Sequence, residues 1–256
     1  MESKIVIFEG NQSDGIFSIS KKFYEPGLSK KERDNRFREA RIKLGKKYGF
    51  NGLHMFQQRQ KMTDNKAYKD NRYVVITNKY MDKEDYFDKV IKADILMITK
   101  DYPGVALCHK TADCPILIAE DRRLGVTALT HTGIYHINRG LPKALIESLI
   151  KEFNSNPKDI YLYIGSHIKK DSYVYNNYPA KATNKEIWKN AITESNGKYY
   201  IDLEQAILNQ LENYDLGGIE ISKNDTATTP GFASHSQFYK NNKSKKGQNI
   251  VGFYYK

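Results

Sequence analysis

A cysteine and a histidine at the ends of two consecutive apolar runs are the residues of this sequence best suited to chemistry. Cys114 directly precedes the run 115–119, and His131 directly follows the run 126–130. If the two runs form adjacent strands, the thiol and the imidazole meet at one edge of a sheet. Such a pair can ligate zinc, or act as a nucleophile with its general base. The alternative is a buried core cysteine and a histidine in a turn.

Helices are predicted in four segments, from apolar spacing and from capping residues. The clearest begins with the capping box of Ser29 and Glu32 and ends at Gly49. Asn138 opens the second helix, ahead of the apolar residues of 141–153. Thr183 with Glu186 opens the third, and Asp202 with Gln205 opens the fourth, ahead of the apolar residues of 203–211.

Short apolar runs typical of strands separate these helices, at 74–76, 95–99, 105–108, 115–119, 126–130 and 160–164. Several are apolar on both alternating faces, which indicates central strands covered by helices on each side. Their close spacing between residues 94 and 130 favours hairpins over βαβ crossovers. Without internal repeats or linkers, we predict a single domain over 1–256, of the α/β (α+β) class, built as a mixed β-sheet sandwich covered by helices.

The chain is basic, with 41 Lys and Arg against 30 Asp and Glu and a net charge of +11. This charge attracts polyanions, but no aromatic-and-basic RNA-binding motif accompanies it, so a solvated surface is favoured over nucleic-acid binding. No apolar run approaches the roughly 20 residues of a membrane span. The chain is Lys-rich and shows no secretory leader. We therefore expect its two cysteines to be reduced thiols and its location to be cytoplasmic. Phosphate-binding glycine loops and Gly-x-Ser-x-Gly elbows are absent, which argues against common nucleotide hydrolases and esterases.

The stretch Ala112-Asp113-Cys114-Pro115, followed by His131 at a strand end and by Gly140, resembles the laccase-domain family. That family is also called polyphenol oxidase-like or purine nucleoside phosphorylase-like. Weaker similarities to its segments follow in the same order through most of the chain, at 35–36, 164–165, 173–174, 202–203, 210–211, 225–226 and 232–235. Their order and spacing together make the resemblance fairly specific.

The resemblance implies phosphorolysis of purine nucleosides, in which phosphate attacks C1′ of the ribose, and some members also deaminate adenosine. It puts Cys114 and His131 at the reacting centre, as catalytic residues and as metal ligands. The expected partners are a nucleoside or nucleotide-linked substrate and phosphate. Further polar residues are predicted to bind substrate, namely Arg59, Asn35, Asp113, His136, His167 and His235. For Asp113 the alternative is a turn-capping role.

The sequence also departs from the family pattern. Where the family carries Gln-x-His, whose His completes the ligand cluster, this chain has Gln57, Gln58 and Arg59. A guanidinium cannot coordinate a cation, so we expect zinc binding to be weakened and multicopper chemistry to be lost. Arg59 is instead predicted to hold a phosphate. Five other histidines could refill the cluster, namely His54, His109, His136, His167 and His235. His136 and His167 are the favoured candidates, because both follow strands expected at the same edge.

Two other functions remain open. Bacterial relatives include a peptidoglycan editing factor, an amidase that removes a wrongly incorporated serine from a nucleotide-linked muramyl substrate. A thiol–imidazole centre and a basic pocket also suit that reaction. The third possibility is a nucleoside- or nucleotide-binding protein that keeps the fold and has lost turnover, because the family's Trp-Arg-Gly and a later Cys are replaced by Ile134-Tyr135-His136 and Asp225.

Overall fold

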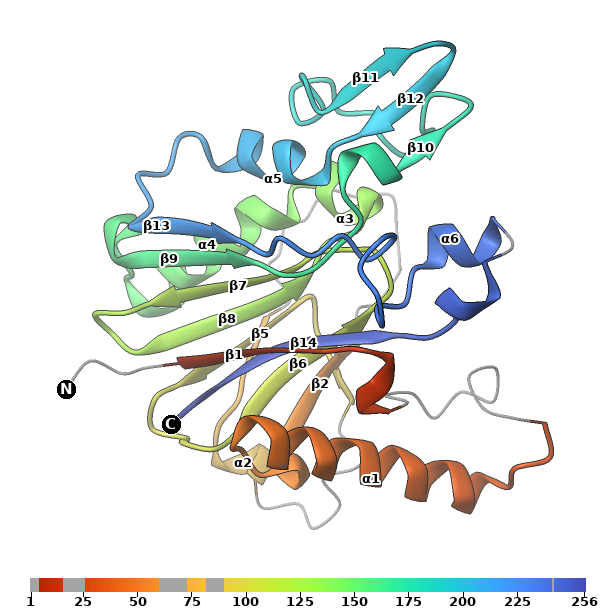
Figure 1. Ribbon diagram of the computed structural model, residues 1–256. Coiled ribbons are helices and arrows are strands. Elements are labelled where there is room, and N and C mark those ends of the chain that lie inside the picture. Colours follow the sequence, from red (N-terminus) through yellow and green to blue (C-terminus); the bar gives the residue numbers. More distant parts are fainter. Residues whose placement is uncertain (1–4, 16–25, 60–72, 82–89, 241) are drawn as a thin grey trace.

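The computed structural model describes residues 5–15, 26–59, 73–81, 90–240 and 242–256, with no side-chain description for Arg59 and Val90. Its strands form three sheets, and the two larger ones pack face to face as a sandwich (Figure 1). Helices cover the outer face of each large sheet, and the small sheet lies at one end (Figure 1).

The five-stranded sheet contains the first and last strands of the chain. Its order is β1 (Ile5–Gly10), β14 (Asn249–Tyr255), β6 (Ala106–Thr111), β2 (Met55–Arg59) and β4 (Val90–Lys92). Helix α1 (Lys30–Tyr48) packs on its outer face, where Ala40 and Leu44 meet Phe8 and Cys108. This sheet is mixed, since β14 runs antiparallel to β6 whereas β2 runs parallel to it.

The six-stranded sheet holds the other half of the core. Its order is β13 (Gly218–Ile221), β9 (Ile160–Ile164), β7 (Ile116–Asp121), β8 (Val126–His131), β5 (Ile95–Thr99) and β3 (Tyr73–Val75). Strands β7 and β8 form an antiparallel hairpin. Its outer face is covered by α3 (Ile134–Asn138), α4 (Leu141–Phe153) and α5 (Leu203–Leu211), which bury their apolar side chains against the strands.

The small sheet has the order β10 (Val174–Tyr175), β12 (Lys198–Ile201) and β11 (Ile192–Ser195). The remaining elements are α2 (Asn78–Met81), α6 (His235–Tyr239) and the single 3-10 turns η1 (Gln12–Asp14), η3 (Gly52–His54), η4 (Pro157–Asp159), η5 (Lys170–Ser172) and η6 (Lys243–Lys245). None of the helices in the described ranges has both the length and the apolar composition of a membrane span.

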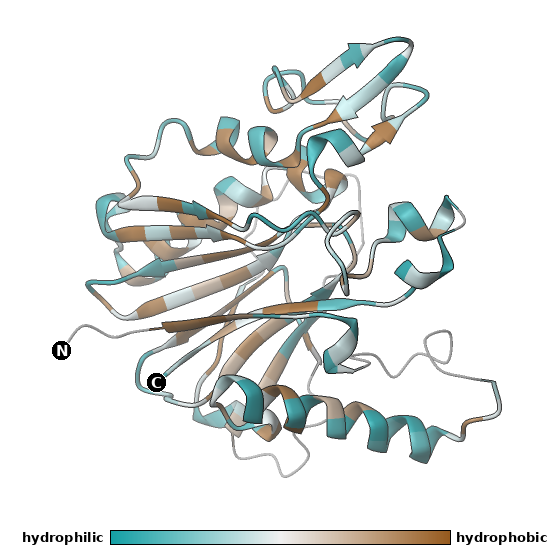
Figure 2. Ribbon diagram, viewed as in Figure 1, coloured by the Kyte–Doolittle hydropathy of each residue, from teal (hydrophilic) through white to brown (hydrophobic). Residues whose placement is uncertain are grey.

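Apolar residues concentrate on the strands of the two large sheets, whereas α1 is mostly polar outside its buried face (Figure 2). Between the sheets lies a core that includes Phe56, Leu107, Ile118, Leu129 and Phe253, all at most 1% exposed. Because strand side chains alternate, the intervening residues face the helices instead. Leu117 and Ala119 of β7 accordingly belong to the core beneath α4.

The predicted α/β sandwich is confirmed, and each predicted strand run overlaps an observed strand. The capping box at Ser29 opens α1, and the side chain of Asp202 caps the start of α5, as expected. Helix α4 begins after Gly140 rather than at Asn138, which ends α3.

The helix predicted from Thr183 is wrong, because residues 185–191 form turns. Asn190 adopts a left-handed backbone with φ 59°, which ends the turn before β11. The Asn138 side chain accepts hydrogen bonds from the Asn184 amide and from Nε1 of Trp188. Tertiary contacts thus override the local helix signal at this segment.

Candidate functional site

The β7–β8 hairpin brings the ends of its two strands together. Ile116 pairs with His131, and the amide of Thr132 donates to the carbonyl of Pro115 over 2.9 Å. Cys114 therefore lies beside the segment that follows His131. A Cβ atom added to Gly133 would come within 2.8 Å of the Cys114 sulfur, so the thiol fills the space that glycine leaves.

Three imidazoles gather next to this hairpin. The rings of His131 and His109 are stacked with centroids 4.6 Å apart, and the ring of His136 meets that of His131 edge-on at 5.5 Å. His131 ends β8, His136 lies on α3, and His109 comes from β6 of the opposite sheet. Alternation along β6 points His109 between the sheets, because its neighbour Cys108 packs toward α1.

Burial keeps these imidazoles uncharged. It lowers the pKa of His109 to about 3 and that of His136 to about 4, with nearby cations adding to the effect. The pKa of His131 is also lowered well below its ordinary value, first by burial and then by the two neighbouring rings. At neutral pH each ring is therefore a potential proton acceptor. Nδ1 of His109 and Nε2 of His136 are buried and have no hydrogen-bond partner among the described residues.

Cys114 is half-buried and holds its proton at neutral pH. Burial raises the pKa of its thiol to about 12, and the carboxylate of Asp113 adds to the rise. The ammonium of Lys181, an exposed residue, acts in the opposite direction, and its charge also lowers the pKa of His136. A thiol in this state donates a hydrogen bond and becomes a nucleophile only when its surroundings change.

Asp113 anchors the turn before β7. Its Oδ1 accepts from the hydroxyl of Thr226 and its Oδ2 from the amide of Ser236, both over 2.7 Å. Burial raises the pKa of this carboxyl, while these hydrogen bonds oppose the rise. Both oxygens are thus occupied in holding the β6–β7 turn against the segment 226–236, which agrees with the turn-capping alternative for Asp113.

The other residues predicted for the site lie in different surroundings. His167 is buried in a separate network, where Nδ1 meets the Gly165 carbonyl at 2.7 Å and Nε2 meets Glu204 at 3.0 Å. His235 is exposed, with its ring against Tyr239. Asn35 is exposed on α1. Arg59 ends β2, and the prediction for its side chain lies outside the described residues.

His109, one of the five histidines that could refill the cluster, joins it although it was not among the residues predicted for the site. It directly follows a run predicted as a core strand, and the packing of β6 against β8 of the other sheet brings it to His131. Of the two histidines favoured to refill the cluster, His136 lies in it and His167 does not contact it through its ring nitrogens.

The described residues do not fit a three-ligand zinc site. Among them, no group of three or more His, Cys, Asp or Glu side chains is arranged to hold a metal ion. The unpartnered nitrogens of His109 and His136 are chemically suitable donors, but they do not form such a group with Cys114. Zinc therefore stays a prediction from the resemblance.

The fold and the site define a class of protein, an α/β sandwich with a thiol and imidazoles at one edge of its larger sheet. The chain belongs to the family described as multi-copper polyphenol oxidoreductase laccase, whose sequence profile matches residues 18–252. The predicted laccase-domain resemblance is confirmed.

Relatives of this chain carry the name purine nucleoside phosphorylase. The protein of that name from Bacteroides thetaiotaomicron is 25% identical over 147 residues, and the one from Clostridium acetobutylicum is 28% identical over 147 residues. These matches cover 56% and 57% of this chain, and they span 53% and 58% of the two relatives' own lengths.

Two crystal structures share the whole fold. Hypothetical protein YfiH from Bacillus licheniformis superposes with a TM-score of 0.73 at 19% identity, covering 98% of this chain and 93% of its own. YlmD from Geobacillus stearothermophilus gives a TM-score of 0.74 at 17% identity, with coverage of 98% and 92%. At these identities the likeness concerns the fold.

Proposed function

We propose that this chain is an enzyme that cleaves purine nucleosides with phosphate. The observation that carries the proposal is the position of the Cys114 thiol beside the segment following His131, next to imidazoles that are uncharged at neutral pH. The name of its relatives supports the substrate class.

In the proposed reaction a phosphate oxygen attacks C1′ of the ribose, and the bond from C1′ to the purine nitrogen breaks. The bonding electrons leave with the purine, which needs a proton. His131 relays this proton as a neutral imidazole, accepting it from hydrogen phosphate at one ring nitrogen while the other nitrogen donates its own proton to the purine, so that no buried imidazolium forms. The products are ribose 1-phosphate and the free base. Cys114 donates a hydrogen bond to the leaving purine, since its thiol keeps its proton.

Phosphate needs a positive partner at this site. Lys181 supplies one among the described residues, because its charge acts on both Cys114 and His136. An ammonium near the reacting centre attracts phosphate and stabilises the charge of the transition state. Arg59 is proposed to add to it, as the sequence suggested.

The test is incubation of the purified chain with inosine, with and without phosphate, and chromatography of the products. We expect hypoxanthine release that requires phosphate and that disappears in His131→Ala. Adenosine in place of inosine separates base release from deamination. No base release at high enzyme concentration, with and without added zinc, overturns the proposal. Serine release from a nucleotide-linked muramyl substrate, with inosine untouched, would favour the amidase instead.

A binding protein without turnover is the second candidate. The observation that favours it is the replacement of the family's cluster histidine by Arg59, together with a thiol that stays protonated. Such a protein is stabilised by its ligand without converting it. Inosine at about 100 times its dissociation constant would raise the free energy of unfolding by roughly 2.7 kcal/mol. That stabilisation without product separates this candidate from the enzyme.

A further inference from the structure

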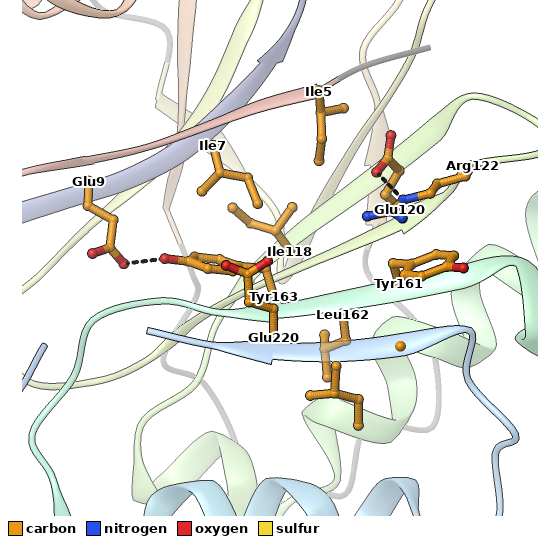
Figure 3. A pocket seen from close by; sticks show the side chains of 12 residues that line it. Ile5, Ile7, Glu9, Ile118, Glu120, Arg122, Tyr161, Leu162, Tyr163 and Glu220 are labelled. Atoms are coloured by element: carbon orange, nitrogen blue, oxygen red, sulfur yellow. Dashed lines mark hydrogen bonds and ion pairs between the residues drawn. The ribbon is translucent and has the colours of Figure 1, made fainter. Parts of the chain in front are cut away.

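A cavity lies over β7 and reaches the end of that strand opposite Cys114. It has a volume of about 710 Å³ and lies between the edge strand β1 and the strands β7, β9 and β13 (Figure 3). Glu120, which lines the cavity, is six positions along the chain from Cys114, and a strand of that length spans roughly 20 Å. The Glu120 end of the cavity therefore lies far from the proposed reaction centre, and the cavity volume is typical of small-molecule sites.

Strand pairing explains which side chains line this cavity. Ile118 and Glu120 of β7 pair with Tyr163 and Tyr161 of β9, and directly paired residues share one face of a sheet. This face points toward the five-stranded sheet, where Ile118 enters the core between the sheets. The five-stranded sheet ends at β1, so the face beyond β1 is left partly open.

Glu120 is the unusual residue of the cavity. It is 4% exposed, and its Oε2 accepts from Nε of Arg122 over 3.3 Å. Its Oε1 is buried and has no hydrogen-bond partner in the described part of the chain. A buried carboxylate oxygen without a donor costs stability, so this atom is a ready acceptor for a ligand.

Two of the neighbouring charged groups, Glu9 and Arg122, are already engaged. Glu9 accepts four hydrogen bonds, from Tyr163, Ser166, Ser222 and Asn224. The Arg122 guanidinium lies over the ring of Tyr161 at 3.6 Å from its centroid, which fixes the cation beside Oε2.

The charge of the cavity is opposite to that of the whole chain. Its charged lining consists of Glu9, Glu120, Glu220 and Arg122, three carboxylates against one cation, whereas the chain carries a net charge of +11. A positively charged ligand is therefore favoured over a neutral or negative one. The apolar wall formed by Ile5, Ile7 and Ile118 requires that the ligand also carry hydrocarbon (Figure 3).

We propose that this cavity binds an aliphatic amine, whose ammonium donates to Oε1 of Glu120 and whose hydrocarbon chain packs on Ile5, Ile7 and Ile118. The ammonium supplies the missing donor, and the chain removes apolar surface from water on both partners. An alcohol of the same length supplies a donor without the charge. A carboxylate of the same length supplies neither.

The experiment is calorimetric titration of the full chain at pH 7 with hexylamine, hexan-1-ol and hexanoate at constant ionic strength. We expect saturable binding of hexylamine, at least about tenfold tighter than of the other two. Equal binding of hexan-1-ol or hexanoate, or no binding of hexylamine up to about 10 mM, overturns the proposal.

Variants then locate the site. Glu120→Gln keeps the shape of the side chain and removes its charge, and it should weaken hexylamine binding by at least about tenfold. Glu212→Gln removes the same charge from an exposed residue that does not line this cavity, so its hexylamine binding should match that of the wild type.

Ile7→Ala shortens the apolar wall without touching Glu120. It should weaken the binding of hexylamine more than the binding of methylamine. Unchanged hexylamine binding in both Glu120→Gln and Ile7→Ala overturns the assignment. Nucleoside cleavage should stay unchanged in Glu120→Gln, because Glu120 lies about 20 Å along β7 from Cys114.

Discussion

The imidazole ring of His109 is stacked on that of His131, with the two ring planes inclined by only 25°. The two histidines belong to different sheets, and their stacking joins β6 to β8 at the edge where Cys114 lies. Both rings are uncharged at neutral pH because burial lowers their pKa values. His109 is thus placed to orient His131, and its unpartnered Nδ1 is available to a ligand.

Replacing His109 by Phe tests which of these roles matters. Phe keeps a flat ring for stacking on His131 and removes both ring nitrogens. We expect the free energy of unfolding to change by less than about 1 kcal/mol, since a buried unpartnered nitrogen is lost together with a hydrogen bond to the Gln58 backbone. Base release from inosine should fall by at least about tenfold, because Nδ1 is missing. A fully active Phe variant alongside an inactive His109→Ala would show that His109 only positions His131.

The two cysteines form a matched pair for the next prediction. Cys114 is half-buried beside the hairpin end, so Cys114→Ala should keep the melting temperature close to the wild type and abolish turnover or ligand binding. Cys108 is fully buried between α1 and the five-stranded sheet, so Cys108→Ala should lower the free energy of unfolding by about 1 kcal/mol or more and keep activity. The measurements are melting temperature and base release, side by side. A clearly destabilised but fully active Cys114→Ala would remove Cys114 from the site.

Local signals predicted much of the fold. The capping box of Ser29 and Glu32 could be recognised because both partners lie within one helical turn. The pairing of β1 with β14 could not be predicted in this way, because Ile5 and Tyr255 lie at opposite ends of the chain. The turn at Asn190 replaced a predicted helix for a similar reason, since the contacts that decide it come from Asn138 on α3.

The same limit applies to the site. Cys114 and His131 could be related from the sequence because they belong to one hairpin, whose strands follow each other along the chain. His109 could not, because its position depends on how the two sheets pack. Residue type alone also gave no reason to prefer His136 over His167 as a member of the cluster. The structure separates them, because His136 meets His131 whereas His167 meets Glu204.

Gly133 allows a test of the close approach between α3 and the thiol. Its φ of −91° is accessible to any residue, so only space requires glycine there. A Cβ atom in Gly133→Ala would lie 2.8 Å from the Cys114 sulfur and displace it. We expect a loss of about 1–2 kcal/mol in the free energy of unfolding.

The double variant with Cys114→Ala provides the control for this prediction. Removing the sulfur removes the clash. Gly133→Ala should therefore lower the free energy of unfolding clearly less in the Cys114→Ala variant than in the wild type. The double-mutant cycle, measured by urea denaturation, isolates this coupling. Additive effects of the two changes would show that the sulfur and residue 133 do not meet.

The last prediction concerns Glu204, whose carboxylate meets Nε2 of His167 at 3.0 Å and also the ammonium of Lys169. These contacts, led by His167, lower the pKa of Glu204 from 4.5 to about 2. The unfolded chain binds a proton here below about pH 4.5, whereas the folded chain does not until about pH 2. The stabilisation is therefore complete above pH 4.5 and is lost as the pH falls toward 2.

Glu204→Gln should lower the free energy of unfolding at pH 7 by about 2 kcal/mol, allowing for partial exposure of the side chain. This difference from the wild type should shrink as the pH falls. Urea denaturation at pH 7, 4 and 3 measures this, with Glu186→Gln as an exposed control. A loss of unfolding free energy that is the same at pH 7, 4 and 3 would contradict the lowered pKa of Glu204.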